Sequence, residues 1–154
     1  MSRGLRIGGH PLHAALSDFP IVLLFLWVVL DGAALVQGAP LLWMLGRWAL
    51  IGGIAAAVLA ASAGFIDYLA LGETAPRAVR TASVHLAVML SVASIAVLAL
   101  VFRGAAPPTG TDLAVHVAAL VLVAAGLGAG GWLGGHLVFH HGVGVTGDRD
   151  ERSG

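Results

Sequence analysis

Long apolar stretches alternate with short polar connections along the chain. Each stretch exceeds the roughly 20 residues that a helix needs to cross about 30 Å of hydrocarbon. Inside a bilayer no water is available to bond backbone N–H and C=O groups, so helices are the expected structure. The apolar pattern therefore predicts four transmembrane helices, at residues 11–36, 41–71, 78–102 and 113–139.

The connections are short, at residues 37–40, 72–77 and 103–112. Loops of this length make each helix antiparallel to the one before it. We therefore expect one antiparallel four-helix bundle, formed by residues 1–145, followed by a short polar tail at 146–154.

Composition supports a membrane protein. Hydrophobic residues make up 58% of the 154 residues and charged residues 10%, which is too little polar surface to cover a soluble globule. The partner of these helices is then the lipid bilayer. A formal net charge of zero, with no basic face, argues against nucleic-acid binding. No nucleophile-elbow motif is present, so an ordinary hydrolase is not expected. We expect an electron carrier or binding protein rather than a stand-alone enzyme.

The arginines predict the orientation, because lysine is absent. Arg47 and Arg103 fall on one side of the predicted bundle. The other six fall on the side of the termini and the middle connection. Positively charged residues favour the cytoplasmic side, so both termini are expected in the cytoplasm. The six are Arg3, Arg6, Arg77, Arg80, Arg149 and Arg152.

Six of the seven histidines lie near helix ends on that same side, and His116 is the exception. Imidazole binds metals and moves protons near neutral pH, so this gathering predicts a site. The six are His10 and His13 at the start of the first hydrophobic segment, His85 early in the third, and His136, His140 and His141 at the end of the fourth.

Local sequence refines the expected role of each histidine. Pro11 is expected at the first helical position, so that the rings of His10 and His13 face one point. His85 lies about two turns inside its helix and needs a polar partner there. His136 and His140, four residues apart, share a face. His141 is expected to point elsewhere, where the glycines of 142–145 unwind the helix. Each ring has a plain alternative, either an interfacial polar group or a structural hydrogen bond.

The acidic residues give a second set of expectations. Asp67 is the carboxylate nearest in depth to the histidines, and it either orients an imidazole or pairs with Arg77 or Arg80. Asp31 is expected on the opposite side, near Arg47 and His116, with a structural or topological role.

Small residues form faces on the second and fourth helices. Such faces allow close helix contact, and they also suit a homo-oligomer interface or room for a flat macrocycle. The two hairpins further resemble each other, each with a histidine at its entry and small residues before a polar residue near its end. The faces are Gly53, Ala57 and Ala61, and Gly126, Gly130 and Gly134.

Several motifs in order resemble the bacterial membrane proteins of domain-of-unknown-function family 2231. The resemblance implies four transmembrane helices and a place in the bacterial cytoplasmic (inner) membrane. It matches His10, His13, His85 and His141 to family histidines. Some family members resemble fusions to Rieske or cytochrome c domains, which implies work near electron transfer. The motifs are residues 10–21, Asp31, residues 64–68, His85, and residues 134–138 and 141–145.

Our leading hypothesis from the sequence is a b-type haem that relays electrons to a redox partner protein. His13 with His85 is the first candidate axial pair and His85 with His141 the second, with Arg77 or Arg80 facing the propionates. The chain has no cysteine, so covalent c-type attachment is excluded.

Two other classes stay open. One is a bundle that binds or transports non-haem Zn, Cu or Fe, because nitrogen and oxygen ligands without sulfur suit these ions. The other is a cofactor-free membrane scaffold subunit. The candidate metal ligands are His10, His13, His85, His136, His140, His141 and Asp67.

Overall fold

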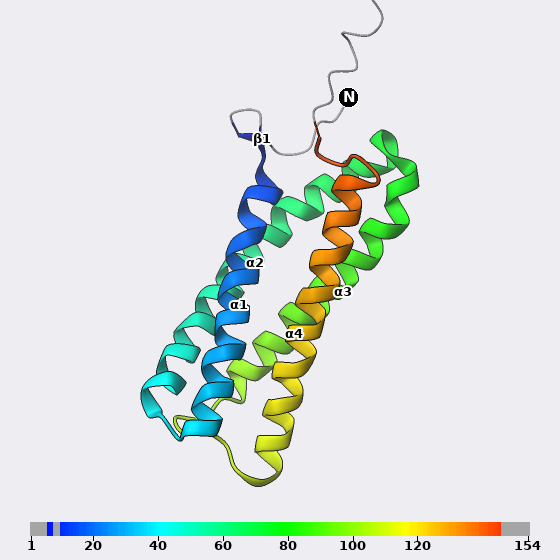
Figure 1. The fold of residues 1–154 in the computed structure, drawn as a ribbon. Helices are drawn as coiled ribbons and strands as arrows, with labels where there is room; N and C mark the ends of the chain where they lie inside the picture. Colours follow the sequence, from blue (N-terminus) through cyan, green and yellow to red (C-terminus); the bar gives the residue numbers. More distant parts are fainter. Residues whose placement is uncertain (1–5, 8–9, 146–154) are drawn as a thin grey trace, which may run out of the picture.

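The computed structural model describes residues 6–7 and 10–145, with the side chains of 12–72 and 75–145. It confirms the predicted all-helical bundle, and each helix begins and ends within three residues of its predicted bounds (Figure 1). The helices are α1 (Leu12–Gln37), α2 (Pro40–Thr74), α3 (Val79–Val101) and α4 (Gly110–Phe139), with a short 3₁₀ turn, η1 (Pro76–Ala78), between α2 and α3.

One detail of the entry to α1 differs from the prediction. Pro11 does not begin the helix. It belongs to a two-residue strand, β2 (His10–Pro11), that pairs antiparallel with β1 (Arg6–Ile7). Helix α1 begins at Leu12, so His13 lies in its first turn, as expected.

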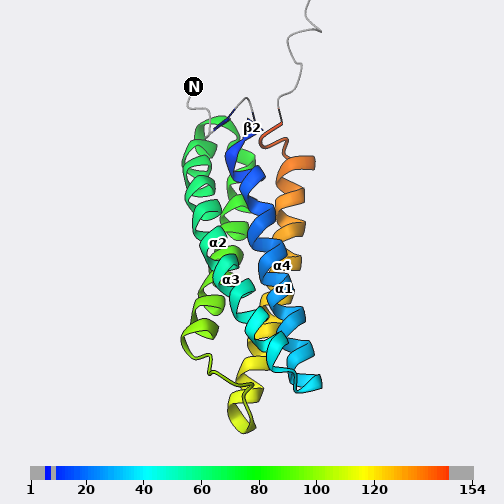
Figure 2. The same cartoon turned by 90° about the vertical axis from the view of Figure 1, so that its left-hand side faces the viewer.

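The helices form two hairpins, α1 with α2 and α3 with α4, and these hairpins pack side by side (Figures 1 and 2). Helix α2 also contacts α3, and α4 contacts α1, so the four helices close into a ring. All four are long and apolar enough to cross a membrane.

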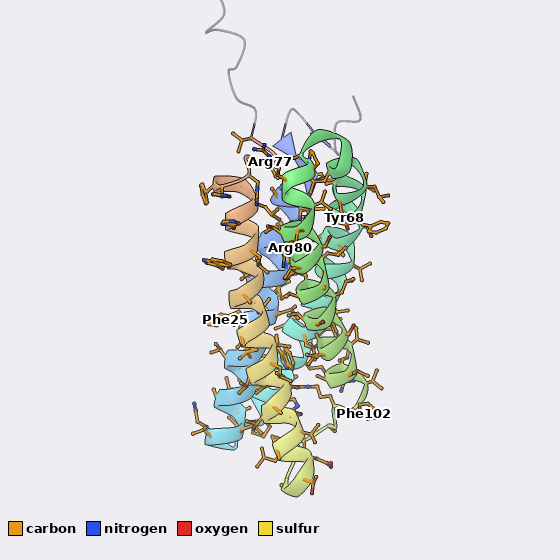
Figure 3. The ribbon with its side chains drawn as sticks, turned by 90° about the vertical axis from the view of Figure 1, so that its right-hand side faces the viewer. Phe25, Tyr68, Arg77, Arg80 and Phe102 are labelled. Carbon is orange, nitrogen blue, oxygen red and sulfur yellow. The ribbon has the colours of Figure 1, made fainter. Side chains whose placement is uncertain are left out.

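The bundle has two ends of different make-up. At one end, called here the terminal end, α1 begins, α2 turns into α3 through η1, and α4 ends (Figure 1). At the other, the loop end, lie the α1–α2 and α3–α4 connections. Figure 3 labels Arg77 at the terminal end and Phe102 at the loop end.

Apolar side chains lie both inside the bundle and on its surface. Trp27, Leu50 and Val123 are fully buried in the central core. Phe25 and Leu69 are more than half exposed, which a lipid solvent favours and water does not. The protein is therefore a multi-pass membrane protein with a lipid environment.

The small residues allow the helices of each hairpin to approach closely. A Cβ atom added at Gly53 would lie 2.7 Å from the Leu24 side chain. Added atoms at Gly126 and Gly130 would overlap Val92 and Met89. These glycines are therefore packing positions, as predicted for both faces.

Candidate functional site

His13 is anchored to the neighbouring helix by one ring nitrogen. Its Nδ1 lies 2.8 Å from the carbonyl oxygen of Ala60 on α2. A carbonyl only accepts, so Nδ1 carries the proton and donates. One turn further along α2, a Cβ at Gly64 would lie 2.7 Å from the His13 ring. The imidazole thus occupies the space that a side chain at Gly64 would fill.

His85 repeats this arrangement in the second hairpin. Its Nδ1 donates to the carbonyl oxygen of Gly130 on α4, at 3.0 Å. A Cβ at Gly134, again one turn on, would lie 3.5 Å from the His85 ring. Each hairpin therefore holds one half-buried imidazole, bonded to a small residue four positions before a glycine.

The two rings lie at the terminal end of the bundle, one from each hairpin. Because both donate through Nδ1, each neutral ring keeps a lone pair on Nε2. Neither Nε2 has a hydrogen-bond partner among the described residues. Neither is a fully buried atom without a partner, since the one such side-chain atom in the described part of the chain is Nε of Arg103 at the loop end. Both Nε2 atoms are therefore open to a ligand.

His136, His140 and His141 form a second group at the terminal end. Their candidate ligand nitrogens all lie within 4.8 Å of one another. The rings of His136 and His140 stack with centroids 4.5 Å apart, which confirms that they share a helix face. His141 meets both rings edge-on.

The expectation that His141 points elsewhere is wrong. Helix α4 widens at its end, where the N–H of His141 donates to the carbonyl of His136, five residues back. Gly142 then adopts a positive φ of 66°, which ends the helix. This turn brings His141 over the other two rings, and its Nε2 lies 3.3 Å from Oγ1 of Thr81 on α3.

Partial burial, followed by the nearby imidazoles of His140 and His136, lowers the pKa of His141 below its usual 6.5. The shift favours the neutral form of the ring, which is the form that binds a metal. The pairing of His85 with His141, the second axial pair expected from the sequence, stays a prediction.

The remaining candidates lie around these two groups. Arg77 and Arg80 are exposed near the terminal end (Figure 3). Asp67 is half-buried in the last third of α2. The backbone of His10 is part of β2, and its side chain lies outside the described residues. The polar tail expected at 146–154 also lies outside them.

Sequence reasoning missed the partner of Asp31 at the loop end. Asp31 is fully buried on α1, and Arg47, which was expected near it, is exposed. Arg103, just beyond α3, forms a buried ion pair with Asp31 through both of its terminal nitrogens. The expected proximity of His116 is confirmed, because its Nε2 lies 2.9 Å from Oδ2 of Asp31.

This loop-end network joins all four helices or their immediate ends. Trp27 donates to Asp31 along α1 at 2.7 Å. Arg103 donates to the carbonyl oxygen of Trp43 on α2 at 2.7 Å and lies 3.5 Å above its ring. A Cβ at Gly46 on α2 would overlap the Asp31 carboxylate. The signal in the sequence was an arginine at the end of an apolar run, at the depth of Asp31 and His116.

The chain matches the profile of one protein family, described as "Predicted membrane protein (DUF2231)", over residues 9–147. The chain belongs to this family. Membership of DUF2231 agrees with four apolar membrane-spanning helices. No curated protein and no solved structure matches the chain. The DUF2231 match covers His13, His85 and the three histidines that end α4.

Proposed function

We propose that this DUF2231 protein holds a b-type haem between His13 and His85 and relays single electrons within the membrane. The observation that carries the proposal is the shared anchoring of the two imidazoles. Both donate Nδ1–H to a helix carbonyl and leave Nε2 open at the terminal end of the bundle, one from each hairpin.

The donor set fits a haem iron. Histidines that bind a metal usually donate their other ring N–H to a backbone carbonyl or carboxylate, which fixes the tautomer and raises the basicity of the ligand. His13 and His85 already have this bond without a ligand. A Cβ at Gly64 would overlap the His13 ring and one at Gly134 would touch the His85 ring, so glycine lets both imidazoles pack against the facing helix.

The position of the pair also suits a cofactor that bridges the hairpins. One imidazole comes from each hairpin, and the carbonyl that anchors it lies 47 residues along the chain in the first and 45 in the second. A group bound to both would link the hairpins where they meet. Arg77 and Arg80, exposed near this end, are the cations available to pair with its propionates.

Two imidazole ligands on one haem would supply one-electron transfer and leave no open coordination position for oxygen chemistry. The protein would then hold the imidazoles of His13 and His85 in place and keep water away from the haem. A redox partner would dock at the terminal end.

The test is a spectrum of protein produced with ample haem supply and purified in detergent. We expect a Soret band and a reduced α-band, both lost in His13→Ala and in His85→Ala. His140→Ala is the matched control, because this exposed histidine lies outside the pair, and it should keep both bands. A wild-type protein without a Soret band would reject the haem proposal and favour the cofactor-free scaffold. Bands that survive both substitutions would reject His13 and His85 as the haem ligands.

A further inference from the structure

The three imidazoles at the end of α4 form a group of their own. They come from residues on consecutive turns of one helix and its final turn, and their candidate ligand nitrogens lie within 4.8 Å of one another. Trp132 stacks on His136 from the turn before, with centroids 5.6 Å apart. Three imidazole nitrogens at this spacing form a donor set of the kind that metal ions use in proteins.

The group lies on the outer side of α4. A shallow surface groove there is lined by Trp132, Gly135, His136, Phe139 and His140. Trp132 and Phe139 are 71% and 91% exposed. His85, in contrast, donates to Gly130 on the buried side of the same helix. The group can therefore take a ligand without disturbing His13 and His85.

We propose that His136, His140 and His141 bind a divalent transition-metal ion, with Zn²⁺ the ion that suits them best. Three imidazole nitrogens with no thiolate favour Zn²⁺, Cu²⁺ or Ni²⁺ over the hard ions Mg²⁺ and Ca²⁺, which prefer oxygen. Tetrahedral zinc at about 2.0–2.1 Å from each nitrogen requires nitrogens roughly 3.4 Å apart. Side-chain rotations would have to shorten the present spacing, which is at most 4.8 Å, to that value.

Neighbouring residues position His141, the third proposed ligand. The turn at Gly142 brings His141 back over the helix end, and Thr81 on α3 holds its ring. A bound ion would therefore join the last turn of α4 to the residues beyond it and, through Thr81, to the start of α3. With three protein ligands, a fourth position stays open to water or to another donor.

The test is calorimetric titration with Zn²⁺ of detergent-purified, chelator-treated protein that carries no polyhistidine tag. We expect one Zn²⁺ per chain and no heat from Mg²⁺. His140→Ala removes an exposed ligand that the fold does not need, and it should weaken binding by at least about 10-fold. The Co²⁺-loaded protein should show the visible absorption of a tetrahedral site, and His140→Ala should lose it.

The matched control is the double variant His13→Ala and His85→Ala, which should bind Zn²⁺ as the wild type does. This control separates the two proposals, since it abolishes haem binding and spares zinc. Wild-type protein that binds no Zn²⁺ would overturn the inference. So would zinc binding that His140→Ala leaves unchanged, or binding that the His13 and His85 variant loses.

Discussion

The Asp31 carboxylate is the most heavily bonded side chain in the described part of the bundle. Its two oxygens accept from Arg103, Trp27 and His116, and no part of the residue is exposed. A buried charge is tolerated only when it is paired and hydrogen-bonded. The network therefore satisfies its own charges while it ties the loop end together.

Removing one charge of this pair should cost more than removing both. In Asp31→Asn, the buried Arg103 cation loses its counter-charge, and we expect a loss of about 3–5 kcal/mol in the free energy of unfolding. Adding Arg103→Gln removes the remaining charge and should recover much of that loss. Unfolding in mixed micelles, followed by circular dichroism, measures both.

Arg47→Gln is the matched control for this prediction. Arg47 was expected near Asp31, but it is exposed, so its removal should change stability by less than about 0.5 kcal/mol. Additive losses from Asp31→Asn and Arg103→Gln would show that the two side chains are not coupled.

At the level of the helix, the hydrophobic pattern was enough to predict the four helices, but it did not predict the contacts between them. Span length and loop length determine four antiparallel helices, because hydrocarbon thickness and backbone bonding leave no other choice. Which carbonyl His13 bonds, or which arginine reaches Asp31, depends on the rotation and register of facing helices. The small residues at 60, 64, 130 and 134 do not by their own chemistry predict a contact with a histidine.

The turn after α4 shows the same limit. A regular helix would place His141 about 100° away from His140 around the axis, which is why it was expected to point elsewhere. The five-residue hydrogen bond to His136 and the positive φ of Gly142 overturn that expectation. Glycine in the sequence signalled that the helix ends, but the direction of the following turn depends on its contact with α3.

Both hairpins place a histidine ring beside a glycine, but the two glycine positions differ in how well they would accept a side chain. A Cβ at Gly64 would lie 2.7 Å from the His13 ring, whereas at Gly134 it would lie 3.5 Å from His85, an ordinary contact. We therefore expect Gly64→Ala to displace its histidine and lower the thermal midpoint by several degrees. Gly134→Ala should leave the midpoint unchanged or raise it slightly, because alanine favours the helix.

Thermal unfolding of the two variants side by side tests this difference. Gly131→Ala serves as the control, since nothing lies within 4 Å of a Cβ at that position. Equal midpoints for Gly64→Ala and Gly131→Ala would mean that the His13 ring is not held against α2 as described.

For the whole molecule, the polar side chains at the two ends of the bundle differ in kind. The terminal end holds both groups of open imidazoles, and the loop end holds a closed network in which the charges of Asp31 and Arg103 neutralise each other. Because Arg103 is paired inside the bundle, Arg47 alone is left as an exposed arginine at the loop end. The excess of unpaired arginines at the terminal end over the loop end is therefore larger than the sequence count indicates. This excess favours a cytoplasmic terminal end.

This orientation is open to a direct measurement, because the chain has no cysteine and any introduced thiol is unique. Single variants Ala105→Cys, in the α3–α4 connection, and Gly72→Cys, near the end of α2, place exposed thiols at opposite ends. In intact bacterial cells, a membrane-impermeant maleimide should label Ala105→Cys and spare Gly72→Cys until the membrane is opened. The reverse pattern would place the histidines on the outer side, where the proposed haem and zinc would meet periplasmic rather than cytoplasmic partners.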